Sequence, residues 1–216
     1  MLRLCLTLIC LCAAAPALPG AWPRGAGQGF GALAARVADG TLPSEPSYRG
    51  SLYLDYGVTP RSGLTLELDT ARGRVVKALG FYRMSLLPPQ GAWQIDAALG
   101  AGRLDGVAVV SPRLTLGRSF RLRGTPGWAE AMLGAEITRT DQAGKIDLTL
   151  GLAPTPRMRS YVQLFAYRAR GGTLHLRGES SLAVRLTNRL WFDTGLSTGI
   201  TPDRDYRLKL GIWTEF

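Results

Sequence analysis

Hydrophobic and polar residues alternate along most of the chain. In the segment 48–57, Leu52, Leu54 and Tyr56 share one face of an extended strand, and Tyr53 and Asp55 lie between them. A period of two places successive side chains on opposite faces of a strand. No segment shows a helical period over more than two turns. The pattern therefore predicts an all-β chain.

The same alternation recurs between turn signals, with about twelve predicted strands in all. They cover residues 29–37, 48–57, 64–69, 78–87, 93–99, 113–120, 128–138, 145–152, 159–167, 174–186, 190–198 and 206–216. Weak patterns at 29–37 and 107–110 leave ten or fourteen strands open. An even number is expected of a single-chain bacterial barrel, and segments of about nine to eleven residues can cross the hydrocarbon when tilted.

The chain ends in an apolar strand with an aromatic last residue. The residues on its apolar face are Tyr206, Leu208, Leu210, Ile212, Thr214 and Phe216. A closed transmembrane barrel must end in this way, because its last strand pairs with its first and leaves no edge in lipid. The segment resembles the C-terminal signature of bacterial outer-membrane β-barrels. That resemblance implies that Tyr206, Leu208, Leu210, Ile212 and Phe216 form a signal for the barrel-assembly machinery. An edge strand of a secreted soluble β-sandwich is the alternative.

The polar faces separate these two folds. If the apolar faces point outward, ten acidic residues point inward: Asp55, Glu67, Asp69, Asp96, Glu130, Glu136, Asp147, Glu179, Asp193 and Glu215. Eight basic residues oppose them: Arg83, Arg113, Lys145, Arg159, Arg177, Arg185, Arg207 and Lys209. A narrow lumen needs such a balance, because unpaired charges there are costly. The balance favours an antiparallel up-and-down transmembrane β-barrel.

Residues 1–20 have the organisation of a secretory signal peptide. Arg3 supplies the positive charge, residues 4–12 are apolar, and Ala15-Pro-Ala17 is a cleavage sequence of the A-x-A type. Cleavage after Gly20 is a second option, and residues 21–216 then form the barrel. The apolar run is too short for a permanent membrane helix.

The three cysteines, Cys5, Cys10 and Cys12, all lie in this leader. The mature chain would contain no thiol, and so no disulfide or thiolate ligand. Neither Cys10 nor Cys12 follows the small residue expected before a lipidated cysteine.

The net charge of +10 argues for an anionic partner. An exported chain meets little nucleic acid, so we expect the partners to be outer-membrane lipid and the phosphates of lipopolysaccharide. Arginine suits phosphate because its fork of N–H groups binds two oxygens. The basic residues expected in outer loops are Arg72, Arg74, Lys77, Arg168 and Arg170.

Two short motifs carry a further resemblance. They are Trp22-Pro-Arg-Gly-Ala-Gly-Gln-Gly-Phe30 and Tyr53-Leu-Asp-Tyr-Gly-Val-Thr-Pro-Arg61. They resemble a group of small outer-membrane barrels of the porin-like superfamily, which have a Trp- and Gly-rich start and a Tyr-Gly-Leu/Val-Thr motif at a turn. The resemblance implies a Gram-negative outer-membrane location, and it transfers no catalytic or binding residue. The lead-in itself is expected to be flexible and periplasmic.

Catalysis has weak support in the sequence. His175 is the only histidine, and a lipid-modifying hydrolase would need it as the base. In outer-membrane lipid hydrolases the nucleophilic serine follows two residues later, where this chain has Arg177. Ser181 lies ~20 Å away along an extended strand, so the hydrolase alternative needs a serine from a neighbouring strand. No metal-ligand spacing or phosphate-binding glycine motif occurs, so no cofactor is expected.

Five basic residues of the late strands can form a positive stripe inside the barrel: Arg159, Arg177, Arg185, Arg207 and Lys209. Such a stripe would favour small anionic solutes. The alternative is that these residues only pair with the ten internal acids. The sequence thus predicts an outer-membrane barrel that is a narrow pore or a structural membrane component.

Overall fold

The computed structural model describes residues 20–39, 48–202 and 204–216. These residues form twelve strands and no helix. The strands are β1 (Gly29–Ala38), β2 (Tyr48–Gly57), β3 (Ser62–Ala71), β4 (Arg74–Ser85), β5 (Trp93–Leu104), β6 (Val107–Leu122), β7 (Thr125–Ile137), β8 (Gln142–Thr155), β9 (Met158–Ala169), β10 (His175–Arg185), β11 (Leu190–Thr201) and β12 (Tyr206–Glu215). Of the predicted leader, only Gly20 belongs to the described residues.

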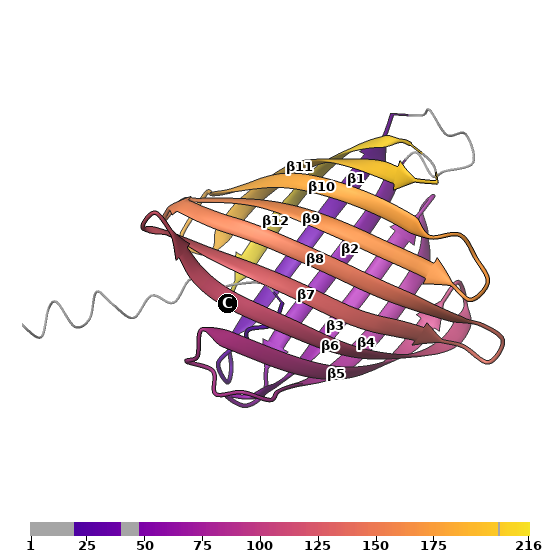
Figure 1. Cartoon of the computed structure of the whole chain (residues 1–216), viewed down its shortest axis with the longest axis horizontal. Helices are drawn as coiled ribbons and strands as arrows, with labels where there is room; N and C mark the ends of the chain where they lie inside the picture. Colours follow the sequence, from indigo (N-terminus) through magenta and orange to yellow (C-terminus); the bar gives the residue numbers. More distant parts are fainter. Residues whose placement is uncertain (1–19, 40–47, 203) are drawn as a thin grey trace, which may run out of the picture.

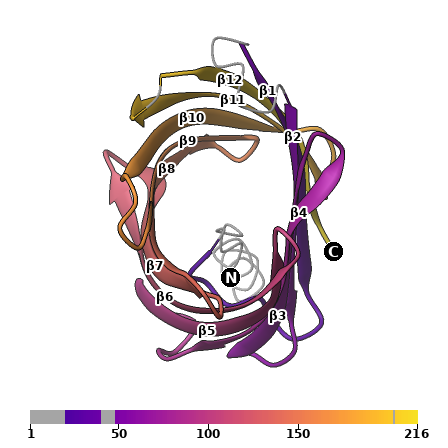
Figure 2. The same ribbon diagram turned by 90° about the vertical axis from the view of Figure 1, so that its right-hand side faces the viewer.

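The strands close into one antiparallel barrel in which each strand pairs with its sequence neighbours. They cross the molecule obliquely in Figure 1 and form a ring in Figure 2. The seam joins β1 to β12, with Phe30 opposite Glu215 and Ala38 opposite Arg207. The predicted twelve-stranded barrel is therefore confirmed, and the alternative of a β-sandwich is wrong.

The apolar faces of the strands form the outside of the barrel. Exposed apolar side chains occur on every strand except β10, whose apolar residues are half-buried or buried, and include Leu33, Tyr56, Leu66, Tyr82, Leu99, Leu114, Leu133, Leu150, Val162, Leu196 and Leu208. The ten acidic residues predicted to point inward all lie on inner strand faces. A barrel that is apolar outside and charged inside is suited to lipid, because its backbone groups are satisfied within the closed sheet. No helix in the described part of the chain is long and apolar enough to cross a membrane.

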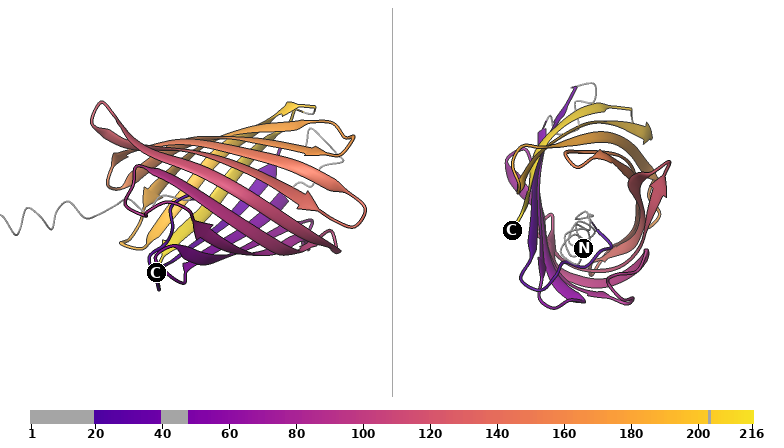
Figure 3. Two further views of the ribbon diagram at one scale, coloured as in Figure 1. Left: turned by 60° about the horizontal axis from the view of Figure 1, so that its bottom comes forward. Right: turned by 90° about the vertical axis from the view of Figure 1, so that its left-hand side faces the viewer.

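Both ends of the barrel sequence lie at one rim, which we call the terminal rim. It also carries the turns at 58–61, 86–92, 123–124, 156–157 and 186–189. The opposite rim carries the turns at 72–73, 105–106, 138–141 and 170–174 and the connection between β11 and β12. The left view of Figure 3 shows the hairpins at the two ends of the tilted strands.

Two-residue turns explain where the strands extend beyond the sequence prediction. Arg72-Gly73 and Asp105-Gly106 have positive φ at both residues, as type I′ hairpins require. Such turns let the paired strands continue up to the turn itself. β4 therefore begins at Arg74 rather than at residue 78, and the weak pattern at 107–110 is the first part of β6. Lys77, expected in an outer loop, lies inside the barrel as a result.

Deleting Phe216 is expected to impair barrel assembly. Its backbone N–H and C=O both bond Gly29, at 3.0 and 2.6 Å, and a Cβ at Gly29 would lie 2.2 Å from the Phe216 ring. The deletion opens the end of the only seam that joins distant parts of the described chain. Heat-modifiable migration on gels measures the folded fraction, and Phe216→Tyr is the control that keeps the ring. Wild-type assembly of the deletion variant would show that the terminal residue is not needed.

Candidate functional site

Two cavities occupy the lumen, one behind the other. The cavity at the opposite rim has a volume of about 1100 Å³, and the inner cavity, which reaches toward the terminal rim, measures about 370 Å³. Arg36, Ser51, Lys145 and Phe165 line both, so these residues mark the boundary between them. The wider space is therefore at the opposite rim, and the lumen narrows toward the terminal rim.

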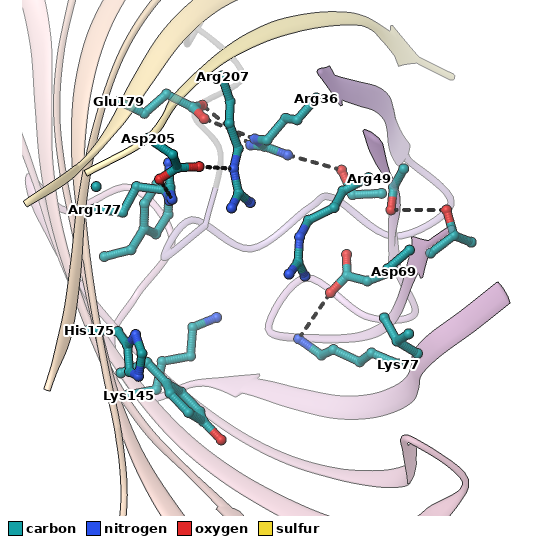
Figure 4. A pocket seen from close by; sticks show the side chains of 18 of the residues that line it. Arg36, Arg49, Asp69, Lys77, Lys145, His175, Arg177, Glu179, Asp205 and Arg207 are labelled. Atoms are coloured by element: carbon teal, nitrogen blue, oxygen red, sulfur yellow. Dashed lines mark hydrogen bonds and ion pairs between the residues drawn. The ribbon is translucent and has the colours of Figure 1, made fainter. Parts of the chain in front are cut away.

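Positive charge dominates the wide cavity (Figure 4). Eight cationic side chains line it: Arg36, Arg49, Arg72, Arg74, Lys77, Lys145, Arg177 and Arg207. Four carboxylates accompany them: Asp69, Asp105, Glu179 and Asp205. The lining thus has a net charge of +4 with His175 neutral. The inner cavity has five cations and five carboxylates, so its lining is neutral.

The cations of the wide cavity come from strands on both sides of the ring. Arg36 lies on the inner face of β1 and binds Glu179 of β10, with Nε 2.9 Å from Oε2. Lys77 of β4 lies 2.8 Å from Glu67 on the neighbouring β3. Both carboxylates lie toward the inner cavity. Glu67 lines this cavity, and Glu179 binds Lys209, which lines it as well.

Asp205 holds two of these arginines at the opposite rim. It precedes β12 and accepts bonds from Arg177 and, at 2.6 Å, from Nε of Arg207. Burial alone would raise the pKa of Asp205, but the bonds from Arg177 and Arg207 hold this pKa below its usual value. The pairing therefore persists at neutral pH and is lost only as the pH falls through that lowered pKa.

Lys209 is the centre of a buried network in the middle of the lumen. Its Nζ lies 2.7 Å from Glu179, 3.0 Å from Asp193 and 2.8 Å from the Tyr161 hydroxyl. Tyr161 in turn donates to Asp193 at 2.8 Å. With Arg36 also bound to Glu179, the network joins β1, β9, β10, β11 and β12 across the inside of the barrel.

Aromatic side chains cluster in the terminal part of the lumen. The cluster consists of Phe30, Trp128, Tyr161, Trp191 and Trp213, with Trp22 and Tyr53 packed against it. Trp191 is 1% exposed and lies under two guanidinium groups, 4.3 Å from Arg159 and 4.7 Å from Arg185. Contacts of this kind are attractive because the ring face is electron-rich.

The lead-in of residues 20–28 lies inside the barrel at this end, where Figures 2 and 3 show it within the ring. Nε of Arg24 lies 3.1 Å from Asp55, and the Gly27 N–H donates to the Gly57 carbonyl at 2.9 Å. Gly57 and Gly117 leave space for it: a Cβ would lie 2.2 Å from the Gly25 oxygen and 2.6 Å from Ala21, respectively. The lead-in, which the sequence predicts to be flexible, is instead a packed segment, because its arginine and backbone groups have partners in the wall.

The five residues of the predicted stripe line the lumen but have local partners. Arg159 lies 3.7 Å from Glu215, and Arg185 stacks on Trp191. Arg177, Arg207 and Lys209 bind the carboxylates described above. They therefore form separate pairs and not a continuous row, and the excess of positive charge lies at the wide cavity.

His175 lies at the start of β10 on the wall of the wide cavity (Figure 4), where it is exposed and pairs with Tyr167 of β9. Arg177 and Ser181 follow it on the inner face of the same strand, as the sequence predicts. Among the described residues, no group of three or more His, Cys, Asp or Glu side chains is placed to hold a metal ion.

Sequence reasoning missed six cations that the structure places in the lumen or on the wall of the wide cavity: Arg24, Arg36, Arg49, Arg72, Arg74 and Lys77. It expected Arg72, Arg74 and Lys77 in outer loops. Arg49 lies on the same face of β2 as Asp55, so the alternation of inner and outer positions predicts that it lies in the lumen. Arg36 ends an alanine-rich weak strand, and Arg24 precedes any strand. No periodic signal marks either of these two.

The closed ring, apolar exterior and charged interior define a transmembrane β-barrel. Its fold is shared with solved outer-membrane channels. The KdgM porin matches with a TM-score of 0.66 at 10% identity, over 87% of this chain and 99% of that one. The NanC porin matches with a TM-score of 0.66 at 8% identity, over 85% and 98%.

A third similar structure is the COG4313 outer membrane channel from Pseudomonas putida F1. Its TM-score is 0.63 at 12% identity, over 92% of this chain and 99% of that one. Neither the family profiles nor the curated proteins give a sequence match to the chain. At these identities the likeness establishes the fold.

Proposed function

We propose that the chain forms a narrow outer-membrane pore that favours anions. The observation that carries this proposal is the distribution of charge along the lumen, +4 around the wide cavity and neutral around the inner one. Cations on low-dielectric walls raise the local concentration of anions and repel cations. The pore is expected to act by this field and by its width, with no catalytic step.

We assign the terminal rim to the periplasm and the wide cavity to the cell surface. An even number of strands brings both ends of a bacterial barrel to the periplasmic side. The opposite rim carries outward arginines such as Arg103 and Arg168, which can bind lipopolysaccharide phosphates there. An anion would enter the basic cavity before it reaches the neutral inner part.

Acidic oligosaccharides are our candidate solutes. The KdgM porin, which shares the fold, has been solved in complex with disordered oligogalacturonate. A cavity of about 1100 Å³ accommodates several sugar units of a saccharide of this kind. The spread of eight cations around the wall suits a chain with repeated carboxylates better than one with a single charge.

The pore proposal is tested by the reversal potential in planar bilayers under a salt gradient. Chloride is expected to be preferred over potassium. Arg49→Gln with Arg74→Gln lowers the net charge of the cavity lining from +4 to +2 and should lower the preference several-fold. Arg103→Gln with Arg168→Gln removes the same charge from the outer wall and is the matched control. Cation preference, or no conductance, would overturn the proposal and leave a structural barrel.

Ionic strength gives an independent check. The Debye length falls from about 10 Å at 0.1 M salt to about 3 Å at 1 M, so the field of the wall reaches less of the lumen. We expect the anion preference to shrink over this range. A preference that is constant with salt would point to size exclusion rather than to the charges.

Solute choice is tested by adding galacturonate oligomers or neutral maltooligosaccharides of the same length to the side of the wide cavity. The acidic oligomers are expected to block chloride current at lower concentration. The Arg49→Gln, Arg74→Gln variant should lose most of this difference. Equal block by both sugars would remove acidic oligosaccharides as the solute class while leaving anion selectivity intact.

A further inference from the structure

Glu130 is the exception among the ten acidic residues on the inner wall. The other nine each form an ion pair with an arginine or lysine of the described chain. Glu130 of β7 has no such partner among the described residues. The one hydrogen bond recorded for its carboxylate comes from the backbone nitrogen of Ala21, at 2.7 Å. A lumen carboxylate without a cation is costly, so a counter-charge is expected at this position.

The Ala21 nitrogen is fully enclosed at the point where it meets this carboxylate. Ala21 is 0% exposed, and it packs on Gly117, where a Cβ would lie 2.6 Å from the Ala21 Cβ. Residue 20 has a positive φ of 85°, and a Cβ there would lie 1.8 Å from Oε2 of Glu130. The wall therefore fits closely around the junction of Gly20 and Ala21.

We propose that signal peptidase cuts between Gly20 and Ala21, and that the new α-ammonium of Ala21 is the counter-ion of Glu130. Hydrolysis by one water breaks the bond between the Gly20 carbonyl carbon and the Ala21 nitrogen. Gly20 leaves as a carboxylate and Ala21 becomes an ammonium group, so atoms and charge balance. The nitrogen that donates one hydrogen bond as an amide then carries the positive charge that Glu130 lacks.

Cleavage at the other sequence option would not supply this charge. A cut after Ala17 has the better cleavage sequence, since Leu18 is not small and stands three positions before the cut after Gly20. It would leave the Ala21 nitrogen as a neutral amide, and Glu130 would still lack a cation among the described residues. The need of Glu130 for a counter-charge thus favours the cut after Gly20, whereas the A-x-A rule favours the cut after Ala17, and the two cuts give different mature chains.

The ion pair also explains how the lead-in is fixed in the lumen. It holds the first residue of the mature chain, while Arg24 holds the fourth through Asp55. Gly27 and Gln28 are held by backbone bonds to Gly57. The segment 21–28 is then anchored at both ends across the terminal part of the lumen.

The first test is the intact mass of the full-length gene product purified from outer membranes. The expected mass is that of residues 21–216. A mass corresponding to a start at Leu18, or to the uncut chain, would overturn the proposal. This measurement involves no conductance, so it stands or fails independently of the proposed pore.

The second test is the reactivity of the α-amine toward an amine-acylating reagent at pH 7, located by peptide mass spectrometry. A free α-amine has a pKa of about 7.7–8.0 and reacts readily at this pH. Pairing with Glu130 should slow its reaction at least tenfold relative to the unfolded protein. Equal acylation rates of the α-amine in the native and the unfolded protein would contradict its pairing with Glu130, and this comparison needs no variant.

Glu130→Gln should restore fast reaction of the α-amine in the folded barrel. Glu136→Gln, on the same face of β7 toward the opposite rim, is the matched control and should leave the rate slow. The three lysines, Lys77, Lys145 and Lys209, are all ion-paired in the lumen and provide internal references. A slow rate in both variants would show that enclosure, and not the Glu130 charge, protects the amine.

Discussion

Removal of residues 21–25 is expected to raise the single-channel conductance several-fold. The lead-in occupies the terminal part of the lumen, where the space has narrowed from about 1100 to about 370 Å³. Ala21 and Arg24 are among its buried residues. Without them, the inner cavity would open toward the terminal rim and the path for ions would widen.

Conductance in planar bilayers measures this effect, and the leader is retained directly before Ala26 so that export is unchanged. Arg24→Gln is the milder variant: it removes the bond to Asp55 but keeps the chain, and an intermediate conductance is expected. Heat-modifiable migration must show that both variants form barrels. Conductance equal to wild type in the deletion variant would mean that the lead-in does not obstruct the ion path.

Replacing Arg83 by Met is expected to destabilise the barrel by about 3–5 kcal/mol, the usual cost of leaving buried charges without their partner. Arg83 is 5% exposed and binds Asp96 at 3.1 Å and Asp55 at 3.0 Å. Its Nη2 donates to the Gly20 carbonyl at 2.7 Å in the uncut chain and also to the Trp22 carbonyl at 3.4 Å, which remains when Gly20 is removed. The substitution leaves Asp96 without its cation, whereas Asp55 keeps Arg24.

Denaturant unfolding in lipid vesicles, followed by tryptophan fluorescence, measures this loss. Adding Asp96→Asn to Arg83→Met should recover part of the stability, because it removes the charge left bare. Arg118→Met is the control: Arg118 is exposed and stacks on Trp93 at 4.8 Å, so its loss should cost no more than about 1 kcal/mol. A similar cost for the two single variants would refute the dependence on buried pairing.

Alternation was sufficient to predict the architecture of the barrel. A strand with one face in lipid and one in the lumen has only two ways to place its side chains. One acidic residue that must avoid lipid therefore shows which positions of its strand face the lumen. Asp55 fixes the inner face of β2, and Glu179 that of β10. The terminal strand closes the count at Phe216, and the structure confirms twelve strands.

This alternation cannot predict which charges meet across the lumen. Arg36 and Glu179 are 143 residues apart, and their contact depends on the tilt and curvature of the closed sheet. The predicted flexibility of the lead-in is wrong for a similar reason. Its glycines indicate flexibility, but the complementary glycines of the wall, Gly57 and Gly117, appear in the sequence only as isolated residues. The charge excess of the wide cavity likewise arises from six separate strands and the β3–β4 turn.

The seam between β1 and β12 also decides when the chain can finish folding. Every other strand pair joins neighbours in sequence, but the seam needs the first and last strands together. A nascent or truncated chain therefore always presents two unpaired edges, which are sites for aggregation and proteolysis. Closure therefore has to wait until β12 is present, and the edge of β1 stays unpaired until then. A product that lacks only β12 would keep eleven strands but remain an open sheet. Its unpaired edges at β1 and β11 would distinguish it from the closed barrel.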